Sequence, residues 1–227
     1  MAQLALNGTI QIPLSVNFVT FTTSSSSSTS YTFSGISIKQ PGLIVIGVHA
    51  RKNDTGFSNL SSVTVNGVSA TIIESVRQVA NSIGVRSSLV AIRINTGTTA
   101  DIVLTYSAPQ TAAAISVYNI QGNLSDTPVG SANSSSTDAN NVLDLNLLTS
   151  ENIQVGIGIC SNLGQLPSWF STQLGALPTL YADGFGSGTF RITGSLYKRG
   201  SATGTTALQC ATIDTNRPSV LVAAVWR

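Results

Sequence analysis

The chain has 227 residues, of which 42% are hydrophobic and only 9% are charged. A disordered chain lacks this much apolar surface, and an ordinary soluble domain carries about a quarter charged residues. The net charge of +2 is too small for electrostatic binding of nucleic acid, so we expect no nucleic-acid partner.

Short strands separated by turn residues follow one another along the chain. Val16–Thr22 alternates apolar and polar residues, and the serine run Ser24–Ser28 after it predicts a loop or hinge. Leu43–Ala50 is apolar on both faces, which predicts a central strand of a two-layer structure. Asn66-Gly67 predicts a type I′ hairpin. Further strands are expected over Tyr31–Ile38, Ser62–Val65, Ala70–Glu74, Leu89–Asn95, Asp101–Tyr106, Ala113–Ile120, Val142–Leu148, Ile153–Cys160, Phe190–Lys198, Thr206–Ile213 and Ser219–Trp226.

Three stretches lack a strand pattern. Ser75–Ile83 is expected to be a short turn of helix or a loop, and Ser161–Gly188 a long loop of the kind that often carries function. Gln121–Asn141 is rich in loop residues and is the candidate boundary between two halves.

The sequence therefore predicts an all-β protein, a β-sandwich or jelly-roll-like fold of about a dozen antiparallel strands with little helix. Residues 1–28 are expected to be an N-terminal strand or arm with a serine-rich hinge. Residues 29–227 are expected to form the β-sandwich domain, which divides into halves at 29–121 and 142–227.

The composition offers few side chains that could take part in catalysis. His49 is the one histidine, and it is expected to be hydrogen-bonded to neighbours at a strand end rather than to act as a base. Seven aspartates and two glutamates are spread over the chain without a spacing that indicates a glycosidase pair. We therefore expect no enzyme, no catalytic residue and no cofactor.

Metal and membrane binding are not indicated either. Cys160 and Cys210 both lie in strand-like runs and are expected to be buried free thiols. No cluster of histidine, cysteine and carboxylate is apparent, so no metal site is expected, calcium in an Asp/Asn loop being the alternative. The longest apolar run, Leu43–Val48, is far shorter than the roughly 20 residues of a membrane span.

Two groups of apolar side chains are candidate interface residues. An aromatic group in the glycine-rich stretch predicts a ligand platform, a subunit contact or a cap over the sandwich; its members are Trp169, Phe170, Tyr181 and Phe185. The N-terminal segment can add a strand to a neighbour's sheet or form the first strand of its own; its apolar residues are Leu4, Ile10, Ile12 and Leu14.

Six short stretches together resemble a group of virion structural proteins of tailed bacteriophages. They are Ser30–Ile38, Leu43–Arg51, Ser62–Ala70, Thr96–Ser107, Ala114–Gly122 and Val220–Arg227. They cover most of the chain after Ser30, and residues 1–28 lie outside the resemblance. The resemblance implies a β-sandwich that decorates a capsid or forms part of a tail or fibre, and it brings no catalytic residues with it.

We therefore expect a virion protein made in the host cytoplasm, first of all a capsid decoration or cement protein that stabilises a phage head by lattice contacts. Its expected partners are the major capsid protein or other virion proteins, and further copies of itself, with a trimer as the first option. Repetition on a lattice turns modest contacts into strong binding. The alternative is a tail-fibre or lectin-like module that binds a host glycan, with Trp169 or Tyr181 stacked on a sugar ring.

Overall fold

The computed structural model consists of β-strands and connecting turns. It describes residues 13–56, 58–123, 125–137, 140–145, 154–164, 168–171, 175–176, 181–185, 190–199, 206–211 and 217–227. For residues 140–145, 168–185 and 195–211 among these, the backbone alone is described. No helix occurs in these ranges, and hence none there is long and apolar enough to cross a membrane. The prediction of an all-β, sandwich-like fold is confirmed.

The first nine strands form two antiparallel sheets, which we call module 1. Sheet A has the order β1-β9-β3-β7-β6, and sheet B has the order β2-β8-β4-β5. Side chains alternate along each strand, so Ile44 and Ile46 of β3 face Phe33 and Leu104 of sheet B in a shared core. The strand bounds are β1 Ser15–Ser24, β2 Ser28–Ser37, β3 Gly42–Lys52, β4 Leu60–Val65, β5 Val68–Ser69, β6 Thr71–Ala80, β7 Ile83–Ile94, β8 Thr99–Gln110 and β9 Ala112–Gln121.

The remaining strands form module 2. Sheet C has the order β10-β18-β12-β16-β15, and sheet D has the order β11-β17-β13-β14. The strand bounds are β10 Gly130–Ser136, β11 Asn140–Leu145, β12 Gln154–Leu163, β13 Ser168–Ser171, β14 Gly175–Ala176, β15 Tyr181–Phe185, β16 Phe190–Arg199, β17 Thr206–Ala211 and β18 Ser219–Trp226. The chain passes from one module to the other between Gln121 and Gly130.

The two modules have the same topology. Adding nine to each strand number of sheet A gives the order of sheet C, and the same operation converts sheet B into sheet D. In each module, the chain thus passes between the two sheets in the same order. One arrangement of nine strands repeated in order along a single chain indicates an internal duplication.

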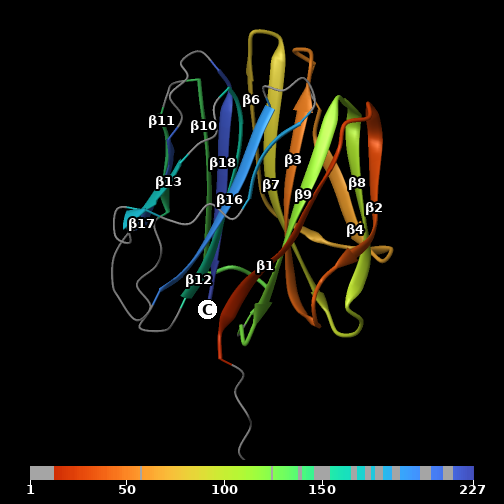
Figure 1. Cartoon of the computed structure of the whole chain (residues 1–227), viewed down its shortest axis with the longest axis vertical. Helices are drawn as coiled ribbons and strands as arrows, with labels where there is room; N and C mark the ends of the chain where they lie inside the picture. Colours follow the sequence, from red (N-terminus) through yellow and green to blue (C-terminus); the bar gives the residue numbers. More distant parts are fainter. Residues whose placement is uncertain are drawn as a thin grey trace, which may run out of the picture.

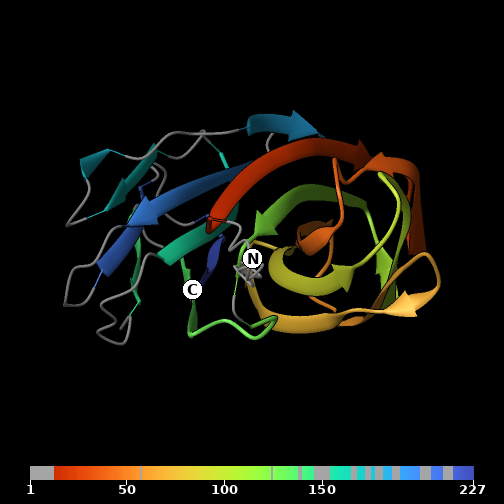
Figure 2. The ribbon, with the colours of Figure 1, turned by 90° about the horizontal axis from the view of Figure 1, so that it is seen from below.

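The modules pack face to face through their equivalent sheets. Figure 1 shows four layers in the order B, A, C and D, and Figure 2 shows the same layers from below. At one edge of the A–C interface β6 contacts β10 and β18, and at the other β1 contacts β16. Equivalent faces that meet in this way resemble the isologous interface of a two-fold dimer. The molecule is therefore organised like a dimer of sandwiches within one chain.

A second core fills the space between sheets A and C. It contains Leu43 and Val45 of β3, Ile157 of β12 and Val222 and Trp226 of β18. The central strands β9, β3 and β7 of sheet A are consequently buried on both faces. The expectation that Leu43–Ala50 forms a central strand is confirmed, and its apolar character on both sides reflects two different cores.

Two connections between strands lie where the sequence predicted them. Asn66 and Gly67 have φ angles of 51° and 78° and connect β4 to β5, as the type I′ prediction requires. The serine run lies where expected, since β1 ends at Ser24 and β2 begins at Ser28. There the chain crosses from sheet A to sheet B.

Two of the expected irregular stretches contain strands. Ser75–Ile83 is neither helix nor loop, because β6 continues to Ala80 and β7 begins at Ile83. Asn81 and Ser82, with φ angles of 51° and 62°, form the turn between them. The expectation of one long loop over Ser161–Gly188 is also wrong, because this stretch holds the end of β12 and all of β13, β14 and β15. Many of its residues are glycine and serine, and these short strands consequently have little apolar alternation.

Candidate functional site

The described part of the N-terminal segment belongs to module 1. β1 pairs with β9 from Ser15 to Ser24, and Leu14 is buried in the core between sheets A and C. Leu14 therefore packs within its own chain. Leu4, Ile10 and Ile12 lie outside the described residues.

The aromatic candidates are divided between two sheets. Trp169 and Phe170 lie in β13 of sheet D, where their backbones pair with Cys210 and Gln209 of β17. The other two, Tyr181 and Phe185, lie in β15 at the edge of sheet C. These four residues do not belong to a single loop, and the side chains of both strands lie outside the described part of the structure.

His49 lies in a polar cluster buried between the modules. Its Nδ1 atom is 2.8 Å from Ser161 Oγ, which is also 2.8 Å from Ser87 Oγ. All three side chains are fully buried. Burial lowers the pKa of His49 from 6.5 to about 3, so the imidazole is neutral at physiological pH. Hydrogen bonding of His49 to neighbouring residues, which the sequence predicted, is thus observed.

His49 and Ser161 occupy equivalent positions in the two modules. His49 pairs with Ala114 of β9, one residue beyond the Ala113 that pairs with the last residue of β1. Ser161 pairs with Val220 of β18, one residue beyond the Ser219 that pairs with the last residue of β10. Equivalent residues of an isologous interface meet near its axis. This contact therefore marks the centre of the A–C interface.

The hydrogen bonds of Ser161 connect it to both His49 and the backbone of module 1. Its hydroxyl donates to the backbone oxygen of Arg86 at 3.1 Å. When the hydroxyl proton is in this hydrogen bond, Ser161 Oγ accepts from the Nδ1–H of a neutral His49. A base would have to present an unprotonated nitrogen to the hydroxyl. The pair suits specific packing of the two modules.

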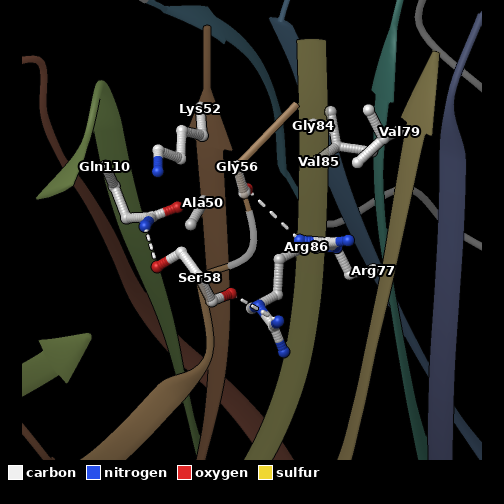
Figure 3. Close-up of a pocket in the computed structure, with 10 residues that line it drawn as sticks. All are labelled: Ala50, Lys52, Gly56, Ser58, Arg77, Val79, Gly84, Val85, Arg86 and Gln110. Atoms are coloured by element: carbon white, nitrogen blue, oxygen red, sulfur yellow. Dashed lines mark hydrogen bonds between the residues drawn. The ribbon is translucent and has the colours of Figure 1, made fainter. Parts of the chain in front are cut away.

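A small basic pocket lies at one end of module 1. Lys52 at the end of β3, Arg77 of β6 and Arg86 of β7 all line it, as Figure 3 shows. Arg77 and Arg86 are direct cross-strand partners, and Arg86 also pairs with Ala50 of β3. The other lining residues are Ala50, Gly56, Ser58, Val79, Gly84, Val85 and Gln110.

The guanidinium group of Arg86 is buried and has no carboxylate partner among the residues that the structure describes. Arg86 is 6% exposed and donates to Ser75 Oγ at 2.7 Å, to the Ser58 backbone oxygen at 2.6 Å and to Asn59 Oδ1 at 3.1 Å. Its Nε atom has no hydrogen-bond partner. Burial first, and then the charge of Arg77, lower the pKa of Arg86, while Tyr106 opposes them.

One of the lining residues, Lys52, pairs with a carboxylate. Asp54 Oδ1 lies 3.3 Å from Lys52 Nζ and accepts a hydrogen bond of 2.7 Å from the backbone nitrogen of Gly56. The Asp54 side chain is 55% exposed. Arg77 Nη1 donates to the backbone oxygen of Gly56 at 3.3 Å. The loop 53–56 thus adjoins the pocket through Gly56, which belongs to its lining.

Sequence reasoning did not find this pocket. Lys52 lies well before the two arginines in the chain, and the β6–β7 hairpin that brings Arg77 opposite Arg86 was expected to be a helical turn or loop. The signal that was available is the turn Asn81-Ser82. Pairing the chain back on itself at that turn places the two arginines in register.

The remaining candidate chemistry concerns the thiols and metals. Cys160 is a buried free thiol, as predicted, and the side chain of Cys210 lies outside the described residues. Within the described ranges no three histidine, cysteine, aspartate or glutamate side chains cluster so that they could hold a metal ion.

Comparisons with known proteins do not place the chain in a family. Family models, curated proteins and solved structures give no match. The function must therefore be inferred from the chain itself.

Proposed function

We propose that this chain is a structural protein of a virion, a capsid decoration protein that stabilises the head by bridging neighbouring subunits of the lattice. The proposal starts from the sequence resemblance to phage virion proteins. Its partners would be the major capsid protein and further copies of the chain.

The internal duplication is the observation that supports this proposal best. Two modules of the same topology, joined through equivalent sheets, give the molecule two related outer layers, sheets B and D, on opposite sides. A body with two related surfaces can contact two copies of a repeated partner. Simultaneous contacts of this kind gain strength by avidity.

The outer face of sheet B suits close contact with a protein surface. Along β2, Ser30, Thr32 and Ser34 are exposed, and they alternate with the buried Tyr31 and Phe33. Neighbouring strands continue the same face, since Thr32 pairs with Val103, which pairs with Thr64. Short hydroxyl side chains carry no charge to desolvate. They lose less conformational entropy than lysine or glutamate when they are covered.

Co-sedimentation with capsids tests the proposal. The purified chain is mixed with capsids that lack it, and binding is compared for the wild type, for Thr32→Arg on sheet B and for Ser135→Arg, an exposed residue of β10. We expect saturable binding of the wild type and of Ser135→Arg, and a loss of at least tenfold for Thr32→Arg, because a desolvated charge opposes the contact.

A chain without residues 1–12 shows whether the N-terminal segment contributes. Deletion of all residues to 28 would remove β1 from sheet A and would therefore test folding as well as binding.

The absence of capsid binding by the intact chain, combined with specific binding on a glycan array, would reject the decoration proposal in favour of the glycan-binding module.

A further inference from the structure

A second pocket lies where the two modules are joined, and we call it the junction pocket. Its walls come from β5, β6, β7 and the linker between the modules, residues 122–129. Arg93, which lines it, pairs with Leu43 near the start of β3. Its volume is about 230 Å³. A drug-sized ligand needs at least about 300 Å³, so the junction pocket has room for a smaller molecule.

A β-bulge shapes the floor of the junction pocket. The register of β6 against β7 shifts between Ile72 and Glu74, so Ile73 is an extra residue. Ile73 packs against the core between sheets A and C, and Glu74 Oε1 accepts a hydrogen bond of 2.7 Å from Ser131 of β10. Two consecutive side chains therefore face module 2, where regular alternation would turn one of them away. Glu74 contacts the other module, and Ile73 forms an apolar floor together with the buried Ala91.

The linker forms a fixed wall of the pocket. Trp226, whose side chain is fully buried, donates from Nε1 to the backbone oxygen of Asp126 at 3.2 Å. The backbone nitrogen of Val129 donates to the backbone oxygen of Val225 at 2.7 Å. Arg93 Nε donates to Asp126 Oδ1 at 2.7 Å. These bonds hold the linker in place without a ligand, so binding would not have to order it first.

The polar groups of the junction pocket fit hydroxyl groups better than ions. Arg93 and Asp126 form an ion pair, so their charges cancel, and an anion would be repelled by Asp126 and a cation by Arg93. Within the described part of the chain, Arg93 uses Nε and Nη2 and Asp126 uses Oδ1. Nη1 remains as a donor and Oδ2 as an acceptor, and a hydroxyl, which both donates and accepts, can bond to either. Thr71 and Thr127 of the lining add two hydroxyls.

We propose that the junction pocket binds one ring of a neutral carbohydrate, either a free sugar or the terminal unit of a glycan. Asp126 and Arg93 bond to neighbouring hydroxyls of the ring, and Thr71 and Thr127 bond to others. The C–H face of the ring packs on Ile73 and the rest of the apolar floor. Such a ligand covers apolar surface while its hydroxyls stay hydrogen-bonded, as burial of polar groups requires.

The junction pocket is separate from the surface that we propose for capsid binding. Ser69 alone of its lining belongs to sheet B, and Thr32, whose substitution tests capsid binding, is not part of it. It also differs from the sugar site that the sequence suggested, since neither Trp169 nor Tyr181 lines it. The linker occurs once in the chain, so we expect one site per molecule. Sugar binding and capsid binding can therefore each fail without the other.

Titration of the full chain by nuclear magnetic resonance tests the site. Glucose, galactose, mannose and N-acetylglucosamine are added separately, with sodium acetate and ethylammonium chloride as charged probes. The backbone amide signals of Thr71 and Thr127 and the Nε–H signal of Arg93 are followed. We expect saturable shifts with at least one sugar and none with the charged probes. An oligosaccharide that ends in the responding sugar is then titrated: tighter binding assigns the site to a glycan end, and equal or weaker binding assigns it to the free sugar.

Variants show whether the shifts arise from this pocket. Asp126→Asn should weaken sugar binding about tenfold, because it removes a charge-assisted hydrogen bond. Thr71→Val keeps the shape of the side chain and should weaken binding about threefold by removing one hydroxyl. Asp54→Asn is the matched control, because Asp54 is 55% exposed against 51% for Asp126 and likewise pairs with one cation, Lys52 at the other end of β3. It should leave the affinity unchanged.

Thr71 and Asp126 are both exposed, so these substitutions leave the core intact, and circular dichroism verifies that each variant keeps the wild-type β content. The proposal is overturned if no sugar gives saturable shifts of the three signals, or if the charged probes give the same shifts as the sugars. It is also overturned if Asp54→Asn weakens binding as much as Asp126→Asn and Thr71→Val do.

Discussion

His49 should make the stability of this protein depend on pH in a way that a single substitution removes. The folded pKa is about 3, against 6.5 for the free side chain, so the unfolded chain binds a proton in the interval between them that the folded chain does not. Stability is then fully present above about pH 6.5 and declines as the pH falls toward 3. The decline is about 1.4 kcal/mol per pH unit, which gives about 3 kcal/mol at about pH 4.5.

Urea unfolding of the wild type and of His49→Gln measures this contribution. Carboxylates also titrate in this range, but both proteins share them, and the chain has no other histidine. The difference between the two free energies of unfolding should therefore change by about 3 kcal/mol between about pH 7 and pH 4.5, with the wild type losing more. A difference that stays constant over this range would refute the placement of a neutral, buried histidine between the modules.

Three further substitutions test the packing and the turns. Trp226→Ala should lower the free energy of unfolding by about 3–5 kcal/mol, because the indole is fully buried in the core between the modules; a loss below about 1 kcal/mol would contradict that burial. Gly47→Ala should cost about 1–3 kcal/mol, because the new Cβ would overlap Ser116 Oγ and approach Ile159 Cγ2 to 3.0 Å. Gly84→Ala is its control, with a nearest contact of 3.4 Å, and equal losses for the two would disprove the reasoning. Ser82→Gly should raise stability by about 0.5–1 kcal/mol, because Ser82 has a φ of 62° that favours glycine; thermal unfolding decides whether it does.

Local sequence patterns predicted those strands in which the order of apolar and polar residues follows the burial of the two faces. β2 alternates between the buried Tyr31 and Phe33 and exposed hydroxyl residues, and β3 is apolar from Leu43 to Val48 because both of its faces are covered. Asn66-Gly67 could be recognised because few residues adopt the positive φ angles of a type I′ turn. Asn81-Ser82 adopts similar angles, but serine at such a position is not a usual turn signal, so the second hairpin was missed.

The duplication of the modules was not visible in the sequence. From Leu43 to Val48 of β3, the equivalent positions on β12 keep an apolar or small residue but not its identity, as Leu43 and Val155, or Gly47 and Ile159, illustrate. A sandwich needs only the alternation of buried and exposed positions to form, so two copies can diverge until that pattern alone remains.

The sequence by itself determined the class of structure, because the alternation of side chains and the turn residues are local properties of the chain. Only the tertiary structure decided that sheet A would be covered by its counterpart in a second module and that His49 would meet Ser161. Each of these contacts depends on strand register and on the packing of one sheet against another. Strand register and sheet packing both bring together residues that are distant in the chain, and no local pattern encodes these contacts.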